Sequence, residues 1–348
     1  EMTRMGLPVP PGFTLSTELW RAHEATGRLP EELDAVLRDE IAWLEGETGR
    51  RFGGREAPLL LAVRSGGPTS MPGMLGTVLN VGCDAAIARG LGQRYGAARF
   101  GLDVRRRFVE SYAVGVLGVP RDAFDAVLGR RDAHALEAPE LDALLTAYER
   151  LVAHEVGEAL DDDPWRQLAR SVEGVLRSWR DPRAVKYREA RGIDHREGTG
   201  VTVQAMVYGN LGSASGAGVA FTRNPSTGER RLFGEWLPQA QGEDVVSGRR
   251  TPAPLTRAQV RRGLEDGSLQ TAQPEVFAEL RALCERLEAH FGDVQDVELT
   301  VEEGRLWILQ CRPAERTARA AARVAVELVD EGTLSRREAL GRIEPSSL

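Results

Sequence analysis

Positions 58–82 read Pro-Leu-Leu-Leu-Ala-Val-Arg-Ser-Gly-Gly-Pro-Thr-Ser-Met-Pro-Gly-Met-Leu-Gly-Thr-Val-Leu-Asn-Val-Gly. The apolar run at 59–63 has the length of a buried strand, and Arg64 follows it directly. The loop that comes next is rich in glycine and hydroxyl side chains, so its backbone N–H groups can approach and cradle phosphate oxygens. Arg64 adds a fork of donors that stays charged at any working pH. The residues alone leave two interpretations open, a phosphate-binding loop and a Gly/Pro-rich surface turn.

The composition of the 348-residue chain excludes several classes of function. A net charge of −7 argues against nucleic acid or an anionic membrane as the main partner. Cys83, Cys284 and Cys311 lie far apart without CxxC spacing, so we expect neither a disulfide framework nor a zinc site. No apolar run has the length of a membrane span and no signal-peptide pattern opens the chain, so we expect a cytoplasmic protein.

Helical periodicity dominates the chain on both sides of the loop. One apolar face predicts a helix over 30–47, and residues 84–181 are expected to be mostly helical. Asp161-Asp162-Asp163-Pro164 is interpreted as a solvated turn with an N-cap at Asp163 rather than a metal site. For Arg105-Arg106-Arg107 we favour a solvated helix face over a phosphate-binding patch.

Strand signals return at 201–207, and a glycine-punctuated segment over 209–248 predicts a second sheet of short strands and tight turns. We expect turn chemistry for the charged residues of that segment. A helix is predicted from about Pro274, with Phe291 among its inward-facing residues.

Residues 293–312 are predicted to form a hairpin around a glycine-containing turn. Asp296, Glu298 and Thr300 share one face of the first strand, while Gln310 and Arg312 share a face of the second. If the loop has an odd number of residues, the four side chains Asp296, Glu298, Gln310 and Arg312 converge. They would then offer oxygen ligands for Mg²⁺ and a phosphate-binding fork. An exposed, salt-bridged hairpin face is the equally weighted alternative.

Several motifs resemble the nucleotide-binding domain of the pyruvate, phosphate dikinase family. Its glycine-rich loop is similar to Arg64-Ser-Gly66, Ser70-Met-Pro-Gly-Met74 and Thr77-Val-Leu-Asn80. The segments 222–229 and 240–246 are similar almost letter for letter, and Asp296-x-Glu298 followed by Gln310-x-Arg312 resembles its metal and phosphate segment.

The resemblance implies an α+β, ATP-grasp fold with two sheet-containing lobes and a helical insertion. It implies a first lobe over 1–83 and 182–207, a helical subdomain over 84–181, a second lobe over 208–315 and C-terminal helices over 316–348.

The family interconverts ATP, phosphate and pyruvate with AMP, diphosphate and phosphoenolpyruvate. The resemblance implies that this domain holds Mg-ATP while a histidine of a swivelling domain takes the diphosphoryl group. Arg64 and Arg312 are then the expected catalytic residues. The expected nucleotide- and phosphate-binding residues are Ser70, Met71, Gly73, Met74, Thr77, Gly218, Glu243 and Gln310. Asp296, Glu298 and Gln310 are the expected Mg²⁺ ligands.

The sequence departs from the family pattern at Gly76, Ala217 and Glu315. None of its five histidines lies in a phosphohistidine motif, so the acceptor domain and the pyruvate/phosphoenolpyruvate-binding domain are expected to lie outside this chain. Three interpretations follow: the nucleotide-binding portion of a full-length dikinase, a free-standing phosphotransferase with another acceptor, and a non-catalytic ATP-binding module.

Overall fold

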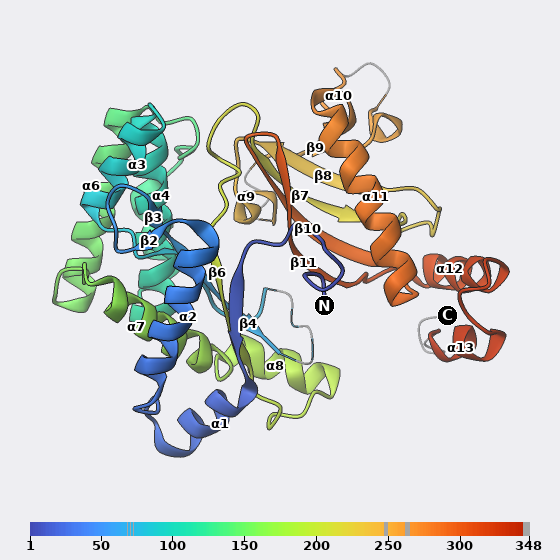
Figure 1. Cartoon of the computed structure of the whole chain (residues 1–348), viewed down its shortest axis with the longest axis horizontal. Coiled ribbons are helices and arrows are strands. Elements are labelled where there is room, and N and C mark those ends of the chain that lie inside the picture. The colour runs from blue at the N-terminus through green and yellow to red at the C-terminus, as the bar shows by residue number, and fades with distance from the viewer. Residues whose placement is uncertain (68, 70, 72, 247–249, 262–264, 344–348) are drawn as a thin grey trace. The chain divides into compact units, whose positions relative to one another are not determined.

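The structure is a computed structural model that describes residues 1–67, 69, 71, 73–246, 250–261 and 265–343. Its contacts divide the chain into two compact units. The first unit comprises residues 11–206, and the second comprises residues 1–10 together with 207–348. Each unit contains one sheet of four or five strands (Figure 1). The expected mixed α+β class is confirmed.

The first unit is built on an antiparallel sheet with the strand order β1-β6-β4-β5. These strands are β1 (Gly12–Leu15), β4 (Leu61–Gly66), β5 (Thr77–Val81) and β6 (Gly200–Ala205). A separate parallel pair joins β2 (Arg51–Phe52) to β3 (Pro58–Leu59). The predicted strand at 59–63 is therefore divided between β3 and β4, and the one predicted at 201–207 ends at Ala205.

The two faces of this sheet differ in chemistry. Val63, Val201 and Val203 alternate onto one face and are buried. Helix α7 (Pro164–Ser178) contacts β4, β5 and β6, and its buried Leu168, Val172 and Val175 lie on one helical face. The opposite face of the sheet carries polar side chains and is partly exposed.

Helices make up most of the remainder of the first unit, as predicted for 84–181. They are α1 (Thr17–Thr26), α2 (Leu33–Thr48), α3 (Ala85–Arg94), α4 (Ala98–Tyr112), α5 (Arg121–Leu128), α6 (Ala138–Val156), α7 and α8 (Pro182–Arg191), with a π-helical turn, η1 (Ala113–Leu117). Helix α4 contacts α3, α6 and β5. The N-cap at Asp163 is confirmed, because its carboxylate accepts hydrogen bonds from the backbone N–H groups of Trp165 and Arg166.

The prediction of a solvated arginine face on α4 is wrong. Arg105, Arg106 and Arg107 are all buried. Arg106 and Arg107 both donate to the buried Asp103, at 2.8 and 2.9 Å. Each guanidinium has a carboxylate partner from α4 or a neighbouring helix. The helical periodicity of one segment does not reveal such partners, so it could not predict that these arginines are buried.

The second unit contains an antiparallel sheet with the order β11-β10-β7-β8-β9. The strands are β7 (Gly216–Phe221), β8 (Phe233–Pro238), β9 (Ala253–Pro254), β10 (Gln295–Glu302) and β11 (Arg305–Pro313). The helices are α9 (Gly242–Val246), η2 (Arg257–Gln259), α10 (Leu269–Ala272), α11 (Pro274–Phe291), α12 (Ala318–Asp330) and α13 (Arg336–Gly341).

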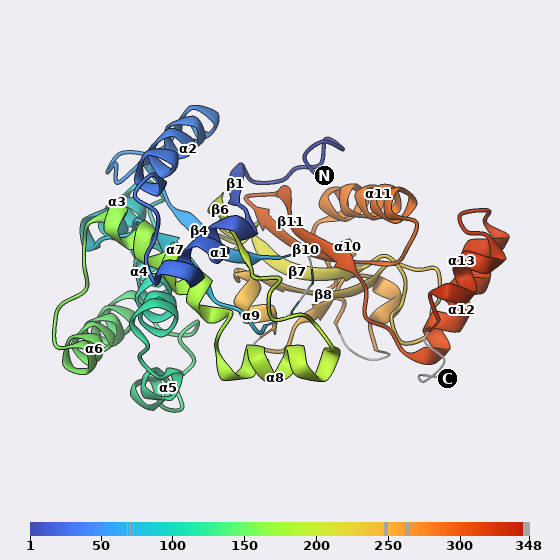
Figure 2. The same ribbon diagram turned by 90° about the horizontal axis from the view of Figure 1, so that it is seen from below.

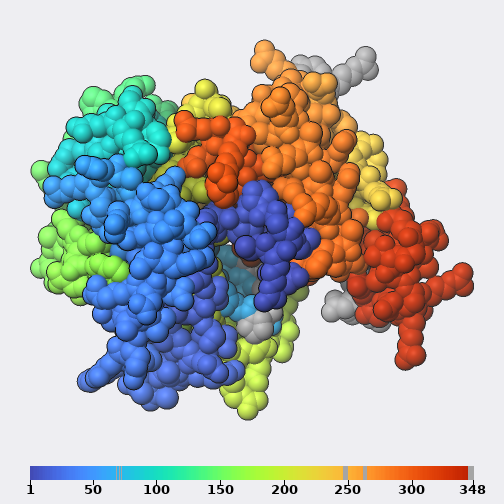
Figure 3. Space-filling model, in the orientation of Figure 1, coloured from blue at the N-terminus to red at the C-terminus, as the bar shows by residue number. Residues whose placement is uncertain are grey.

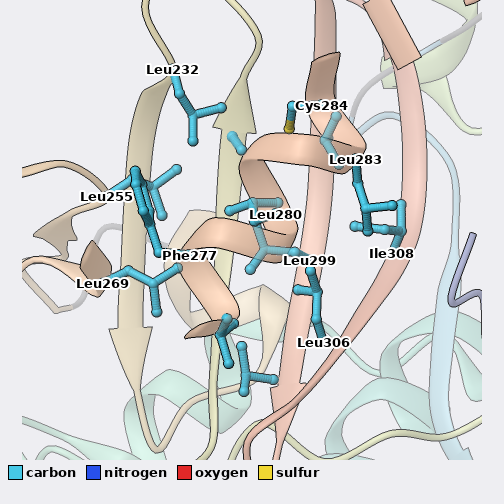
Figure 4. Close-up of a cluster of buried hydrophobic side chains, with 14 of the residues drawn as sticks. Leu232, Leu255, Leu269, Phe277, Leu280, Leu283, Cys284, Leu299, Leu306 and Ile308 are labelled. Carbon is cyan, nitrogen blue, oxygen red and sulfur yellow. The ribbon is translucent and has the colours of Figure 1, made fainter. Parts of the chain in front are cut away.

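Helix α11 covers one face of this sheet (Figure 2). Leu280, Leu283 and Cys284 of α11 meet Leu299 and the residues of β11 in one buried cluster (Figure 4). The predicted helix is confirmed, but the inward orientation of Phe291 is not, because its side chain is 39% exposed. Phe291 is the last residue of α11, directly before the left-handed C-cap Gly292, and is not among the buried residues of the helix.

Residues 1–10 belong to the second unit (Figure 3, dark blue beside the orange atoms of α11). Leu7 joins the apolar cluster under α11, and the N–H of Ile308 donates to the carbonyl of Pro8 at 2.8 Å. The sequence-based division grouped these residues with the first lobe. The finer four-part division of the chain stays a prediction.

The segment 222–229 follows β7 along the chain and contacts the helices α11 and α12. Asn224 makes the expected turn, since its side-chain oxygen accepts from the N–H groups of Ser226 and Thr227. Arg223 is fully buried and pairs with Glu288 of α11, with Glu327 of α12 and with Glu331, the C-cap of α12. Arg223 therefore ties the sheet to both helices, which turn chemistry alone does not predict.

Candidate functional site

The β10–β11 hairpin turns through two residues, Glu303 and Gly304, both of which have positive φ. Such a turn fits the twist of a hairpin and confirms the predicted glycine-containing turn. The number of residues in this loop is even. If the β10–β11 pairing continued from it without interruption, Gln310 and Arg312 would lie on the core face. The register instead shifts between Glu298 and Leu299, because Leu309 forms a bulge.

The bulge restores the convergence of the four predicted side chains. Asp296 lies directly opposite Arg312, and Glu298 lies directly opposite Gln310. Directly paired residues share a face, so all four project from the same side of the sheet. Val297, Leu299 and Val301 project from the other side into the cluster under α11.

Asp296 and Arg312 form an ion pair, with Nε of Arg312 donating to Oδ2 of Asp296 at 2.8 Å. Asp296 is buried, and its other carboxylate oxygen, Oδ1, has no hydrogen-bond partner within the described part of the chain. A buried carboxylate oxygen without a donor is costly, and it fits a position that a cation or a hydrogen-bond donor occupies on binding.

Arg64 lies on the polar face of the sheet in the first unit. It is directly paired with Thr77 of β5 and with Thr202 of β6, and Thr202 is paired in turn with Thr14 of β1. The hydroxyls of Thr14 and Thr202 lie 3.1 Å apart. One row across four strands thus presents a guanidinium between hydroxyl groups, a combination suited to an anionic oxygen ligand.

The glycine-rich loop joins the ends of β4 and β5. Gly73 has a φ of +66°, and the N–H of Met74 donates to the carbonyl of Met71 at 3.1 Å. Left-handed backbone at Gly73 explains why glycine stands there. Met71 is buried, Met74 is half-buried, and Ser70 lies outside the described residues.

Two side chains from distant segments hold this loop. The N–H of Gly76 donates to Oγ of Ser178 at the end of α7, at 2.9 Å. The hydroxyl of Thr69 donates to Oε2 of Glu197 at 2.8 Å. Sequence reasoning missed Ser178 and Glu197, because no motif connects them to the loop over separations of 102 and 128 residues.

Gly218 and Glu243 are placed differently from the hairpin residues. Gly218 is paired with Leu299 and Trp236, so it lies on the face covered by α11, opposite the four converging side chains. A Cβ on Gly218 would lie 2.7 Å from the carbonyl oxygen of Glu235. Glu243 is exposed on α9, a short helix that contacts β7, β8 and β10.

Comparison with known proteins identifies the family. The family model described as pyruvate phosphate dikinase, AMP/ATP-binding domain, matches residues 26–277 and 259–333. The chain belongs to this family. It is 45% identical to the pyruvate, phosphate dikinase of Rhizobium meliloti (strain 1021), with 100% of the chain and 40% of the relative covered. It is 43% identical to pyruvate, phosphate dikinase 2 of Oryza sativa subsp. japonica and 42% identical to the enzyme of Rickettsia conorii (strain ATCC VR-613 / Malish 7).

Each of these three alignments covers 100% of the chain but only 39–40% of the relative, so the chain spans about two fifths of the length of these dikinases. It is an AMP/ATP-binding domain of the dikinase family. None of the helices in its described residues is both long and apolar enough to span a membrane.

The side chains of the β10–β11 hairpin supply only part of a metal's ligands. Such a partial set fits Mg²⁺ bound together with a nucleotide better than a metal whose ligands all come from the protein. Among the described residues no group of three or more His, Cys, Asp or Glu side chains could hold a metal ion. Mg²⁺ in nucleotide sites is held by one or two carboxylates, with phosphates and water completing the octahedron. Asp296 with its orphaned Oδ1, together with the Glu298–Gln310 pair, provides such a partial set.

Proposed function

We propose that this chain binds Mg-ATP and performs the ATP half of the dikinase reaction. In that half-reaction a diphosphoryl group passes from ATP to a histidine on a domain outside this chain. The observation that carries the proposal is the bulged register of the hairpin, which places two carboxylates, an amide and a guanidinium side by side.

Each side chain has a role that its chemistry supports. Asp296, Glu298 and Gln310 supply oxygen ligands for Mg²⁺, which offsets negative charge on the phosphates. Arg312 and Arg64 stabilise charge on the transferring phosphoryl groups, an electrostatic and positioning contribution. Ser70, Met71, Gly73, Met74, Thr77, Gly218 and Glu243 complete the proposed nucleotide- and phosphate-binding set, in which Glu243 sets the orientation of the nucleotide.

The remaining partners follow from the same proposal. A swivelling phosphohistidine domain receives the diphosphoryl group, and a further domain binds pyruvate and phosphoenolpyruvate. The net charge of −7 disfavours nucleic acid and anionic membranes as main partners. The three free cysteines fit a reducing, cytoplasmic location.

Isothermal titration of ATP into the chain, with and without Mg²⁺, tests the proposal. We expect Glu298→Ala to weaken Mg-ATP binding by at least about tenfold, since even second-shell changes at metal sites weaken affinity by that much. Arg64→Lys keeps the charge but loses the planar fork. With an acceptor histidine domain supplied in trans, we expect phosphoryl transfer to slow by about tenfold, equivalent to ~1.4 kcal/mol, while Mg-ATP binding weakens less.

Glu303→Gln is the matched control, because Glu303 is exposed at the turn of the same hairpin. This variant should bind Mg-ATP like the parent chain. Equal affinities for the parent chain and Glu298→Ala would contradict the metal assignment, and a parent chain that does not bind Mg-ATP would refute the proposed function.

A further inference from the structure

The face that carries Asp296 and Glu298 continues toward the hairpin turn in a third row of residues. Thr300 of β10 is paired with Trp307 of β11 on one side and with Ala217 of β7 on the other. Ala217 and Thr300 are buried, and neither residue is charged. The Thr300–Trp307 row is therefore uncharged. It lies between the rows that carry Asp296, Glu298 and Arg312 and the charged Glu302–Arg305 row beside the turn.

Trp307 carries an unmet hydrogen-bonding group on this face. Leu306 and Ile308 on either side of it point into the cluster under α11, so the indole projects from the opposite face. Its Nε1 is buried and has no hydrogen-bond partner in the residues that the structure describes. A buried indole N–H normally has an acceptor, so this atom indicates a ligand-facing position.

The guanidinium of Arg305 lies 4.0 Å from the centroid of the Trp307 ring. A cation over one ring face is attracted by the ring and leaves the other face of the indole for a further contact. The side chain of Trp307 is half-buried, so part of the indole stays accessible.

We infer that Trp307 contacts the nucleoside end of the bound nucleotide. This contact makes the site prefer a ligand with an aromatic base over a phosphate chain without one. The inference rests on the proposed binding of Mg-ATP and adds the direction in which the nucleotide lies. Charged residues at Asp296, Glu298 and Arg312 attract the metal and the triphosphate. The uncharged Thr300–Trp307 row accepts the base and sugar, with Nε1 donating to an acceptor atom of the nucleoside.

Trp307→Leu and Trp307→Phe, titrated with Mg-ATP and with magnesium tripolyphosphate, test this inference. Trp307→Leu removes the aromatic surface, and we expect about tenfold weaker Mg-ATP binding, as for loss of one base–aromatic contact. Trp307→Phe keeps a smaller aromatic ring but loses the N–H, so its loss should be smaller than that of Trp307→Leu. Tripolyphosphate has no base, and its affinity should be the same in both variants and the parent chain.

Tryptophan fluorescence provides a second readout. We expect Mg-ATP, but not tripolyphosphate, to change the emission of the parent chain, and this change should be absent in Trp307→Phe. Trp43→Phe is the control, because Trp43 is exposed on α2 in the other unit and its loss should leave the change intact.

The outcomes separate the two hypotheses. A parent chain that binds neither ligand refutes the proposed function together with the inference. Unchanged Mg-ATP affinity in Trp307→Leu, or equal losses for Mg-ATP and tripolyphosphate in both variants, overturns the inference while the proposed function stands. If Trp307→Leu does not fold, Trp307→Phe decides: an unchanged affinity and fluorescence response in that variant overturn the inference.

Discussion

Asp103 on α4 is a carboxylate that the protein keeps ionised inside its core. It is buried beside Arg106 and Arg107, and both donate to it. Burial alone would raise its pKa, but the guanidiniums of Arg107 and Arg106 hold the pKa of Asp103 well below its usual range. A buried ion pair of this kind adds little net stability, yet removing one partner leaves an uncompensated charge.

Asp103→Asn should therefore lower the free energy of unfolding by about 3–5 kcal/mol at pH 7. Because the folded pKa of Asp103 is depressed, its contribution is present above the unfolded pKa and is lost as pH falls from about 4 toward the folded value. Urea unfolding of the parent chain and the variant at pH 7 and at lower pH measures both effects.

Asp34→Asn is the matched control, since Asp34 pairs with Arg38 at 2.8 Å on the exposed side of α2. Loss of that surface pair should change stability by less than about 0.5 kcal/mol. A difference between Asp103→Asn and Asp34→Asn of under about 1 kcal/mol would show that the α4 network does not stabilise the fold as described.

At the scale of elements, the hairpin shows which part of the site was predictable. Alternation along 295–302 correctly separates Asp296 and Glu298 from the core-facing Val297 and Leu299. Whether Gln310 and Arg312 lie on the same face depends on whether the number of unpaired residues between the two strands is odd or even. The turn alone contributes two, an even number, and the bulge at Leu309 makes the number odd. No local signal in the sequence distinguishes Leu309 from its apolar neighbours.

Two single-residue deletions in β11 test this explanation. Deleting Leu309 removes only the bulged residue, so Gln310 and Arg312 keep their partners and face, and Mg-ATP affinity should change by less than about threefold. Deleting Cys311 moves Arg312 by one position onto the core face. That variant should lose Mg-ATP binding by at least about tenfold and should be less stable, because an arginine is buried without a partner.

Circular dichroism and calorimetry on the two deletion variants provide the comparison. Equal loss of Mg-ATP binding in both variants would show that binding does not depend on which face of β11 carries Gln310 and Arg312.

At the scale of the whole molecule, the chain divides into two units, and each presents one polar sheet face with predicted site residues. Hydrophobic periodicity was sufficient for the strands near 59–63 and 201–207, the 293–312 hairpin, α2, α11 and the helical character of 84–181, while the mixed fold class came from the family resemblance. It was insufficient where long-range pairs decide the outcome, as for the buried arginines of α4, the Arg223 cluster and the loop anchors Ser178 and Glu197. The grouping of residues 1–10 with the second unit depends likewise on the contact of Pro8 with Ile308 of β11, three hundred positions away.

The central claim is that the bulged hairpin holds the divalent metal of the bound nucleotide. Mn²⁺ can replace Mg²⁺ at oxygen ligands, and it enhances the relaxation of water protons when a macromolecule holds it. We would measure water-proton relaxation in mixtures of Mn²⁺, ATP and either the parent chain, Asp296→Asn/Glu298→Gln or the control Glu303→Gln. The parent chain and the control should enhance relaxation beyond that of Mn-ATP alone, and the double variant should not. An undiminished enhancement in the double variant would contradict the assignment of the metal to this hairpin.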